Sequence, residues 1–239
     1  FNRELLRGAN ERASALGFKI EVFNVAGDSG VSIVRLNHIL QSRGIQGVLL
    51  MPVWDSPDFT ALDWSRYAGV YADYMIDRPA LHSLCADHHR SLVTALEQVT
   101  SRGYRRVGLV MQRRHDERLQ YRCQGAFLGY QQNNPQCGQV PPLVADDVNP
   151  ATFGAWFKKH QPDVVLAHDP RVVDWMSSHG ADVPETHGFV SLNLLQATTP
   201  CAGLDPQPAQ IGLKAAEVLI AKLHRNERGT PSISSLTMI

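Results

Sequence analysis

The sequence has no apolar run long enough to cross a bilayer. Its longest apolar stretches, such as 48–53, fall far short of the roughly 20 residues that a transmembrane helix needs. The chain also opens without a basic segment followed by an apolar stretch, so we expect no secretory signal. These absences predict a protein that is not embedded in a membrane and that works in the cytoplasm.

A surplus of positive charge is missing as well. Lysine and arginine total 23, and aspartate and glutamate total 23, which gives a formal net charge of zero. A domain that grips DNA by itself usually has a basic face, because contacts to phosphates dominate its affinity. Any contact of this protein with DNA is therefore expected to come from a segment outside these 239 residues.

Clustered cysteines and local catalytic motifs are also absent. The four cysteines are far apart in the sequence and form no CxxC pair, which predicts reduced thiols rather than a metal site or a disulfide framework. The adjacent His88 and His89 point apart on any regular element, and His115 belongs to a charged segment that we expect to form a loop. No glycine-rich phosphate loop, GxSxG or HExxH motif occurs, so we expect no cofactor and no enzymatic activity.

The hydrophobic pattern alternates between the period of helices and that of strands. The first helix has Leu5, Ala9 and Ala13 at helical spacing, and Gly17 ends it. Residues 18–24 then alternate apolar and polar side chains, as a half-buried strand does. Further helices are predicted at 33–43, 91–102, 118–131, 150–160, after Pro170, and at 208–224; further strands are predicted at 47–51, 106–111, 142–145, 163–167 and 187–192.

This alternation predicts an α/β fold made of parallel sheets with helical crossovers. A glycine followed by a buried-type strand occurs twice, at 42–50 and at 101–110, which is consistent with two similar α/β lobes. No low-complexity linker separates them, so we expect several short crossing segments and a hinged pair of lobes.

Seven motifs, spread in order over nearly the whole chain, make this sequence similar to the LacI/GalR family of bacterial transcription regulators. They are FNRELLRG at 1–8, GIQGVLLMP at 44–52, DHHR at 87–90 with RGYRRVGLV at 102–110, RCQGA at 122–126, AHD at 167–169, GADVPETHGF at 180–189, and IGLKAA at 211–216. The sequence departs from the family pattern in Asn193, where an aspartate is frequent, and in His168, where an asparagine is frequent. The family's helix-turn-helix head and the strand that precedes its first helix are also missing.

The resemblance implies two Rossmann-like parallel-sheet lobes joined by crossover hinge segments, the type I periplasmic-binding-protein-like fold. It places 1–103 with 206–226 in an N-terminal lobe, and 104–205 with 227–239 in a C-terminal lobe. It also implies a homodimer that reaches operator DNA through the absent head, and a small polar effector, a sugar or a related metabolite, that binds between the lobes.

Ligands of parallel α/β folds collect at the carboxyl ends of strands, which singles out side chains that follow predicted strands. Arg122 resembles the family's effector-gripping arginine, with Arg118 as the second choice, and its planar guanidinium suits vicinal hydroxyls or a carboxylate. The other candidates for ligand binding are His168, Asp169, Asn193, Asp87, Trp54 and Phe1.

Each candidate also has a purely structural interpretation. An arginine on a helix is usually solvated, and Trp54 can cap the core of its lobe rather than stack on a ligand. Asp169 and Asp87 can cap the helices that follow them, and Asn193 can be a turn residue.

Two other functions stay open. A periplasmic sugar-binding protein of a transporter would have nearly the same fold, and a doubly wound enzyme would have similar strand–helix alternation. The sequence upstream of Phe1 would distinguish the periplasmic binding protein from the regulator. A helix-turn-helix there indicates a regulator, and a signal peptide indicates a transport protein.

Overall fold

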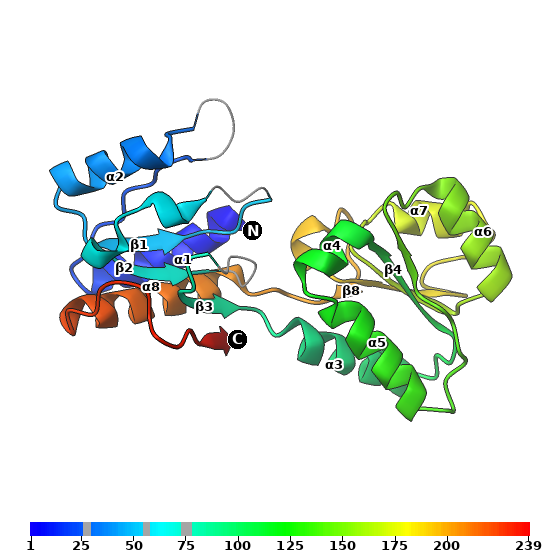
Figure 1. Ribbon diagram of the computed structural model, residues 1–239. Coiled ribbons are helices and arrows are strands. Elements are labelled where there is room, and N and C mark those ends of the chain that lie inside the picture. Colours follow the sequence, from blue (N-terminus) through cyan, green and yellow to red (C-terminus); the bar gives the residue numbers. More distant parts are fainter. Residues whose placement is uncertain (26–29, 55–57, 73–77) are drawn as a thin grey trace. The chain divides into compact units, whose positions relative to one another are not determined.

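The structure, a computed structural model, describes residues 1–25, 30–54, 58–72 and 78–239. The chain divides into two units: Phe1–Ala86 with Gln207–Ile239 form unit 1, and Asp87–Pro206 forms unit 2. Each unit has one parallel β-sheet with helices, as the sequence predicts (Figure 1).

Unit 1 contains a four-stranded sheet in the order β1-β2-β3-β9, with all pairs parallel. Helices α1 and α8 pack against each other beside this sheet (Figure 1). The elements are α1 Asn2–Ala15, α2 Ile33–Ser42, β1 Gly47–Leu50, η1 Phe59–Ala61, η2 Trp64–Arg66, β2 Ala68–Tyr71, β3 His82–Cys85, α8 Pro208–His224 and β9 Leu236–Met238.

Unit 2 contains a five-stranded sheet in the order β5-β4-β6-β7-β8, again all parallel. Buried clusters cover the sheet, one built around Leu109 and Phe127 and another around Phe153 and Val165. The elements are α3 His88–Ser101, β4 Val107–Gln112, α4 Arg113–Arg118, α5 Arg122–Asn133, β5 Leu143–Ala145, α6 Pro150–His160, β6 Val164–Ala167, α7 Val172–Ser177, β7 Gly188–Ser191, η3 Leu194–Gln196 and β8 Ala202–Gly203.

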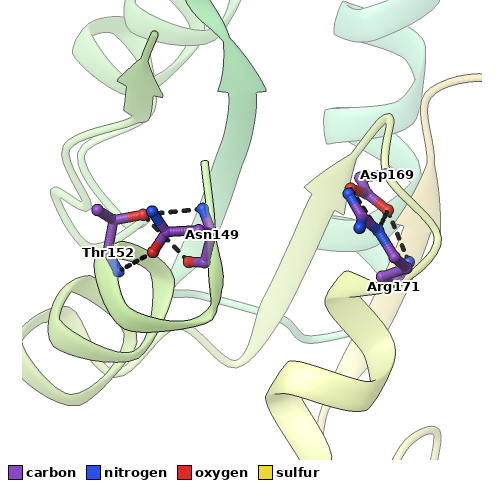
Figure 2. Close-up of polar contacts among 4 residues, drawn as sticks. All are labelled: Asn149, Thr152, Asp169 and Arg171. Atoms are coloured by element: carbon purple, nitrogen blue, oxygen red, sulfur yellow. Dashed lines mark hydrogen bonds and ion pairs between the residues drawn. The ribbon is translucent and has the colours of Figure 1, made fainter. Parts of the chain in front are cut away.

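Local sequence explains where α6, the helix that follows β5, begins. Asn149 caps α6: its Oδ1 accepts from the backbone N–H groups of Ala151 and Thr152, both at 3.0 Å. The hydroxyl of Thr152 accepts in return from the backbone N–H of Asn149 at 3.0 Å, which completes a capping box (Figure 2). Pro150 at the first helical position needs no hydrogen-bond partner for its nitrogen.

Two glycines allow the backbones of α1 and α8 to approach each other closely. A Cβ atom at Gly8 would lie 1.9 Å from the carbonyl oxygen of Ala209, and one at Gly212 would lie 1.9 Å from the carbonyl oxygen of Leu5. No side chain fits at such distances, so the two helices cross backbone to backbone. Leu5, Ile211 and Ala215 are buried beside this crossing.

Residues 18–24 form no strand, which contradicts the prediction from their alternating pattern. They pair with no strand among the described residues, and β1 stands at the edge of its sheet. Phe18, Ile20 and Val22 instead line a groove of about 1310 Å³ beside β1 and α8. Alternation places apolar side chains on one face, but a strand also needs a neighbour for its backbone groups, and the sequence pattern does not supply one.

The lobe boundaries differ from the predicted ones in two places. Helix α3, placed at 88–101, packs against α5 and therefore belongs to unit 2 rather than to the N-terminal lobe. The C-terminal segment, predicted in the other lobe, forms β9 and pairs with β3 through Leu84 and Thr237 in unit 1. The chain passes between units at Ala86–Asp87 and at Pro206–Gln207.

The helix predicted at 118–131 begins later than expected, since α4 ends at Arg118 and α5 begins at Arg122 and runs to Asn133. Gln120 and Tyr121 have φ values of 50° and 59°, and they separate α4 from α5. Two consecutive residues in the left-handed region cannot continue a right-handed helix. Asp116 secures the junction, since its Oδ1 accepts from the backbone N–H of Gln124 at 3.2 Å.

We predict that Gly8→Ala and Gly212→Ala each destabilise the protein by about 1–3 kcal/mol, because the added methyl overpacks the crossing of α1 and α8. Urea unfolding followed by circular dichroism measures the effect. The control is Ser14→Ala on the exposed side of α1, for which we expect a change within about 0.5 kcal/mol. Wild-type stability in Gly8→Ala would contradict the close approach of the two helices.

Candidate functional site

A pocket of about 440 Å³ opens at the carboxyl ends of the strands of unit 2. The register aligns these ends: Val110 lies beside Ala167, and Ala167 lies beside Ser191. The residues that line the pocket follow β4, β5, β6 and β7 or end β4; they are Val110, Met111, Gln112, His115, Val148, His168, Asp169, Pro170, Arg171 and Gln196. The site therefore lies where parallel α/β sheets usually bind ligands.

Two of the predicted binding residues line this pocket. His168 and Asp169 directly follow β6, and both side chains are partly buried. The ring of His168 lies 5.2 Å from that of His115, centroid to centroid, at an interplanar angle of 44°. The sequence assigned His115 to a loop, whereas the structure places it on α4 at the pocket wall.

The histidine pair is held in its neutral form. Burial, together with smaller contributions from the neighbouring His115 and His88, lowers the pKa of His168 to about 3. Burial also lowers the pKa of His115, with Arg118 and Arg114 adding to the effect. A neutral imidazole offers one N–H donor and one nitrogen acceptor.

Asp169 lies at the pocket but does not cap the helix that follows it, since the N-cap residue of α7 is Arg171 and α7 has no side-chain cap. Its Oδ1 accepts from the backbone N–H of Arg171 at 2.9 Å, and its carboxylate pairs with the Arg171 guanidinium, Nη2 to Oδ2 at 2.6 Å (Figure 2). Burial raises the pKa of Asp169, but the hydrogen bonds from Arg171 outweigh it and lower the pKa.

Three further predicted residues belong to unit 2 but do not line this pocket. Asp87 caps α3, its Oδ1 accepting from the backbone N–H of Arg90 at 2.9 Å. Asn193 caps η3 and accepts from the backbone N–H of Leu195 at 3.1 Å. Arg122 starts α5 and is half-buried. The structure thus supports the capping interpretation of Asp87 and Asn193, and the ligand role of all three stays a prediction.

The remaining two predicted residues lie in unit 1. Phe1 is the N-cap residue of α1 and is 43% exposed, and Trp54 is 56% exposed. Such exposure argues against Trp54 as a cap of its lobe's core, and its contact with a ligand stays a prediction.

Four polar residues that line the pocket were missed from the sequence: Gln112, His115, Arg171 and Gln196. Gln112 ends β4, and His115 follows three residues later. Side chains that follow a strand were already favoured, so the same rule applied to β4 would have found this pair. Gln196 belongs to the short η3 after β7, which no periodicity predicts.

No group of three or more histidine, cysteine, aspartate or glutamate side chains suited to a metal occurs in the described part of the chain. Across the same residues, no helix is long and apolar enough to span a membrane. None of the four cysteines forms a disulfide, and burial raises the pKa of Cys123 to about 12.

Comparison with known proteins decides the fold. The chain superimposes over nearly its full length on a LacI transcriptional regulator from a Rhodococcus species, with a TM-score of 0.73, 14% identity, 98% of this chain covered and 89% of the other. The chain has the LacI-type regulator fold. This is the two-lobed periplasmic-binding-protein-like architecture that the motifs predict.

Two further solved transcription regulators also superimpose on this chain over nearly its whole length. The transcription regulator CcpA of Lactococcus lactis gives a TM-score of 0.71 at 15% identity, covering 100% of this chain and 91% of the other. A LacI transcriptional regulator from Lactobacillus brevis gives 0.70 at 15% identity, covering 100% and 93%. No protein-family model and no curated protein matches the chain. At these identities the likeness concerns the fold.

The neutral state of His168 predicts acid sensitivity. In the unfolded chain a histidine takes up its proton near pH 6.5, whereas His168 in the folded protein does so near pH 3. The unfolded state therefore binds more protons in this interval, and the stability that neutral His168 contributes is complete above pH 6.5 and is lost as the pH falls below it.

We expect the urea midpoint of wild-type protein to fall between pH 7.5 and pH 5, and to fall less steeply in His168→Gln. The exposed His89, outside the pocket lining, supplies the control His89→Gln, which should keep the wild-type slope. Equal slopes in wild type and His168→Gln would contradict the neutral buried imidazole.

Proposed function

We propose that the chain is the effector-sensing and dimerisation domain of a LacI-type transcriptional repressor of a bacterium. One observation carries this proposal: the pocket at the carboxyl ends of β4, β6 and β7 occurs in a chain that has the LacI-type fold over nearly its whole length. The protein acts in the cytoplasm, catalyses no reaction and binds operator DNA through a helix-turn-helix head that is not among these 239 residues.

The pocket is suited to a small polar effector, a sugar or a related metabolite. Its volume of about 440 Å³ is within the range of small-molecule sites. Gln112 and Gln196 offer amides, and His115 and His168 offer one donor and one acceptor each. Apolar walls from Val110, Met111 and Val148 exclude water from the less polar parts of such a ligand.

In this proposal the effector changes the preferred arrangement of the two lobes. A ligand shifts an equilibrium only by its difference in affinity for the two states, so the effector must bind one arrangement more tightly. In a two-fold dimer this shift changes the spacing of two DNA-binding heads on a pair of half-sites. The named solved structures are regulators, which favours this function over a transporter's binding protein.

A thermal-shift screen against sugars, sugar phosphates, nucleosides and nucleobases tests the proposal. A ligand at a hundred times its Kd adds about 2.7 kcal/mol of stability, which raises the melting midpoint visibly. We expect at least one compound to do so in wild type, and the shift to disappear in His168→Ala and to weaken in Arg122→Ala.

The control is His160→Ala, at the opposite edge of the same sheet. Arg106, which precedes β4, donates to the carbonyl oxygens of His160 and Gln161, so His160 lies at the amino ends of the strands. The His160→Ala variant should keep the full thermal shift. A screen without a hit, or a hit that His168→Ala does not reduce, would contradict a sensor that uses this pocket.

A further inference from the structure

The charges that line the pocket compensate each other. Within the described residues, its lining contains only two formally charged side chains, Asp169 and Arg171. Four more lining residues are polar: Gln112, His115, His168 and Gln196. The charge available to a ligand therefore depends on whether Asp169 and Arg171 remain paired and whether the imidazoles take up protons.

Asp169 holds Arg171 through several contacts at once. The Nε of Arg171 lies 3.1 Å from both carboxylate oxygens, and its Nη2 lies 2.6 Å from Oδ2. The guanidinium also lies over the ring of Trp175, 5.6 Å from its centroid. The pair is partly solvated, with 69% of the Arg171 side chain and 28% of the Asp169 side chain exposed. A geometry with several hydrogen bonds keeps such a pair together better than a single surface contact does.

The imidazoles add no positive charge. Burial and the nearby His115 and His88 keep the pKa of His168 near 3, and burial with Arg118 and Arg114 lowers the pKa of His115. Neither of these arginines lines the pocket. An anion placed among these groups would lose its hydration. Among the described lining residues the cation is Arg171, and it is already paired with Asp169.

We propose that this pocket selects an uncharged ligand that offers both hydrogen-bond donors and acceptors, and that it rejects the phosphorylated relatives of that ligand. This inference rests on the proposed function, since it assumes that the pocket is the effector site. Its basis is the Asp169–Arg171 pair together with the polar but uncharged wall of Gln112, His168 and Gln196.

Matched pairs of compounds test the selectivity by calorimetric titration: ribose against ribose 5-phosphate, glucose against glucose 6-phosphate, and adenosine against its 5′-monophosphate. We expect the uncharged member of the binding pair to have an affinity at least tenfold higher. An equal or higher affinity for the phosphorylated member would overturn the inference while leaving the sensor function intact, whereas the absence of binding by every member would count against the proposed function.

A charge substitution tests the cause with inorganic phosphate as the probe. Asp169→Asn leaves the guanidinium of Arg171 without its carboxylate, so phosphate should bind this variant at least tenfold more tightly than wild type. Asp146→Asn is the matched control, because Asp146 pairs with Arg113 at 2.8 Å and neither residue lines the pocket. It should leave the affinity for phosphate unchanged.

The double variant Asp169→Asn/Arg171→Gln separates charge from loss of structure. It removes both partners, so phosphate binding should return to the wild-type level while circular dichroism confirms that the protein remains folded. Phosphate binding by wild type as tight as by Asp169→Asn would overturn the inference. So would tighter phosphate binding in the double variant than in wild type, since no lining cation then remains.

Discussion

The parallel register of β4, β6 and β7 is the constraint on which the candidate site depends. Because Val110, Ala167 and Ser191 lie side by side, the segments that follow these strands meet at one edge of the sheet. His115, Asp169 and Gln196 are distant in sequence, yet each follows one of these strands and lines the same pocket. A slip of register would separate them, and the buried strand residues on both sheet faces hold the register in place.

The same edge determines the electrostatic character of the pocket. The strands supply apolar walls, and the partial burial of His168 beside them lowers its pKa and keeps the ring neutral. The turn after β6 brings Arg171 back onto Asp169, two residues earlier, and their charges cancel locally. A polar wall without a free charge results from local chain geometry and from burial together, and it suits ligands that bind through hydroxyl or amide groups.

The sequence predicted those features that depend on local periodicity. The helices around Leu5, Leu96 and Phe157 and the buried strands β4 and β6 follow directly from the spacing of apolar residues. The sequence also placed His168 and Asp169 at the site, because a side chain after a buried parallel strand is placed by topology alone. It could not predict that 18–24 forms no strand, that β9 pairs with β3, or that the backbone at Gln120 and Tyr121 delays the start of α5, because these depend on long-range pairing and backbone conformation.

Nitrogen-15 NMR of the histidine side chains directly tests whether unit 2 has a ligand site built on neutral imidazoles at the carboxyl ends of its strands. Protein labelled on histidine would be titrated with the compound that gives the largest thermal shift, at pH 7. We expect His168 to have the nitrogen shifts of a neutral ring before addition, and the signals of His168 and His115 to move on binding while that of His160 stays in place. A protonated His168, or ligand-induced shifts that leave both pocket histidines unchanged, would contradict such a site.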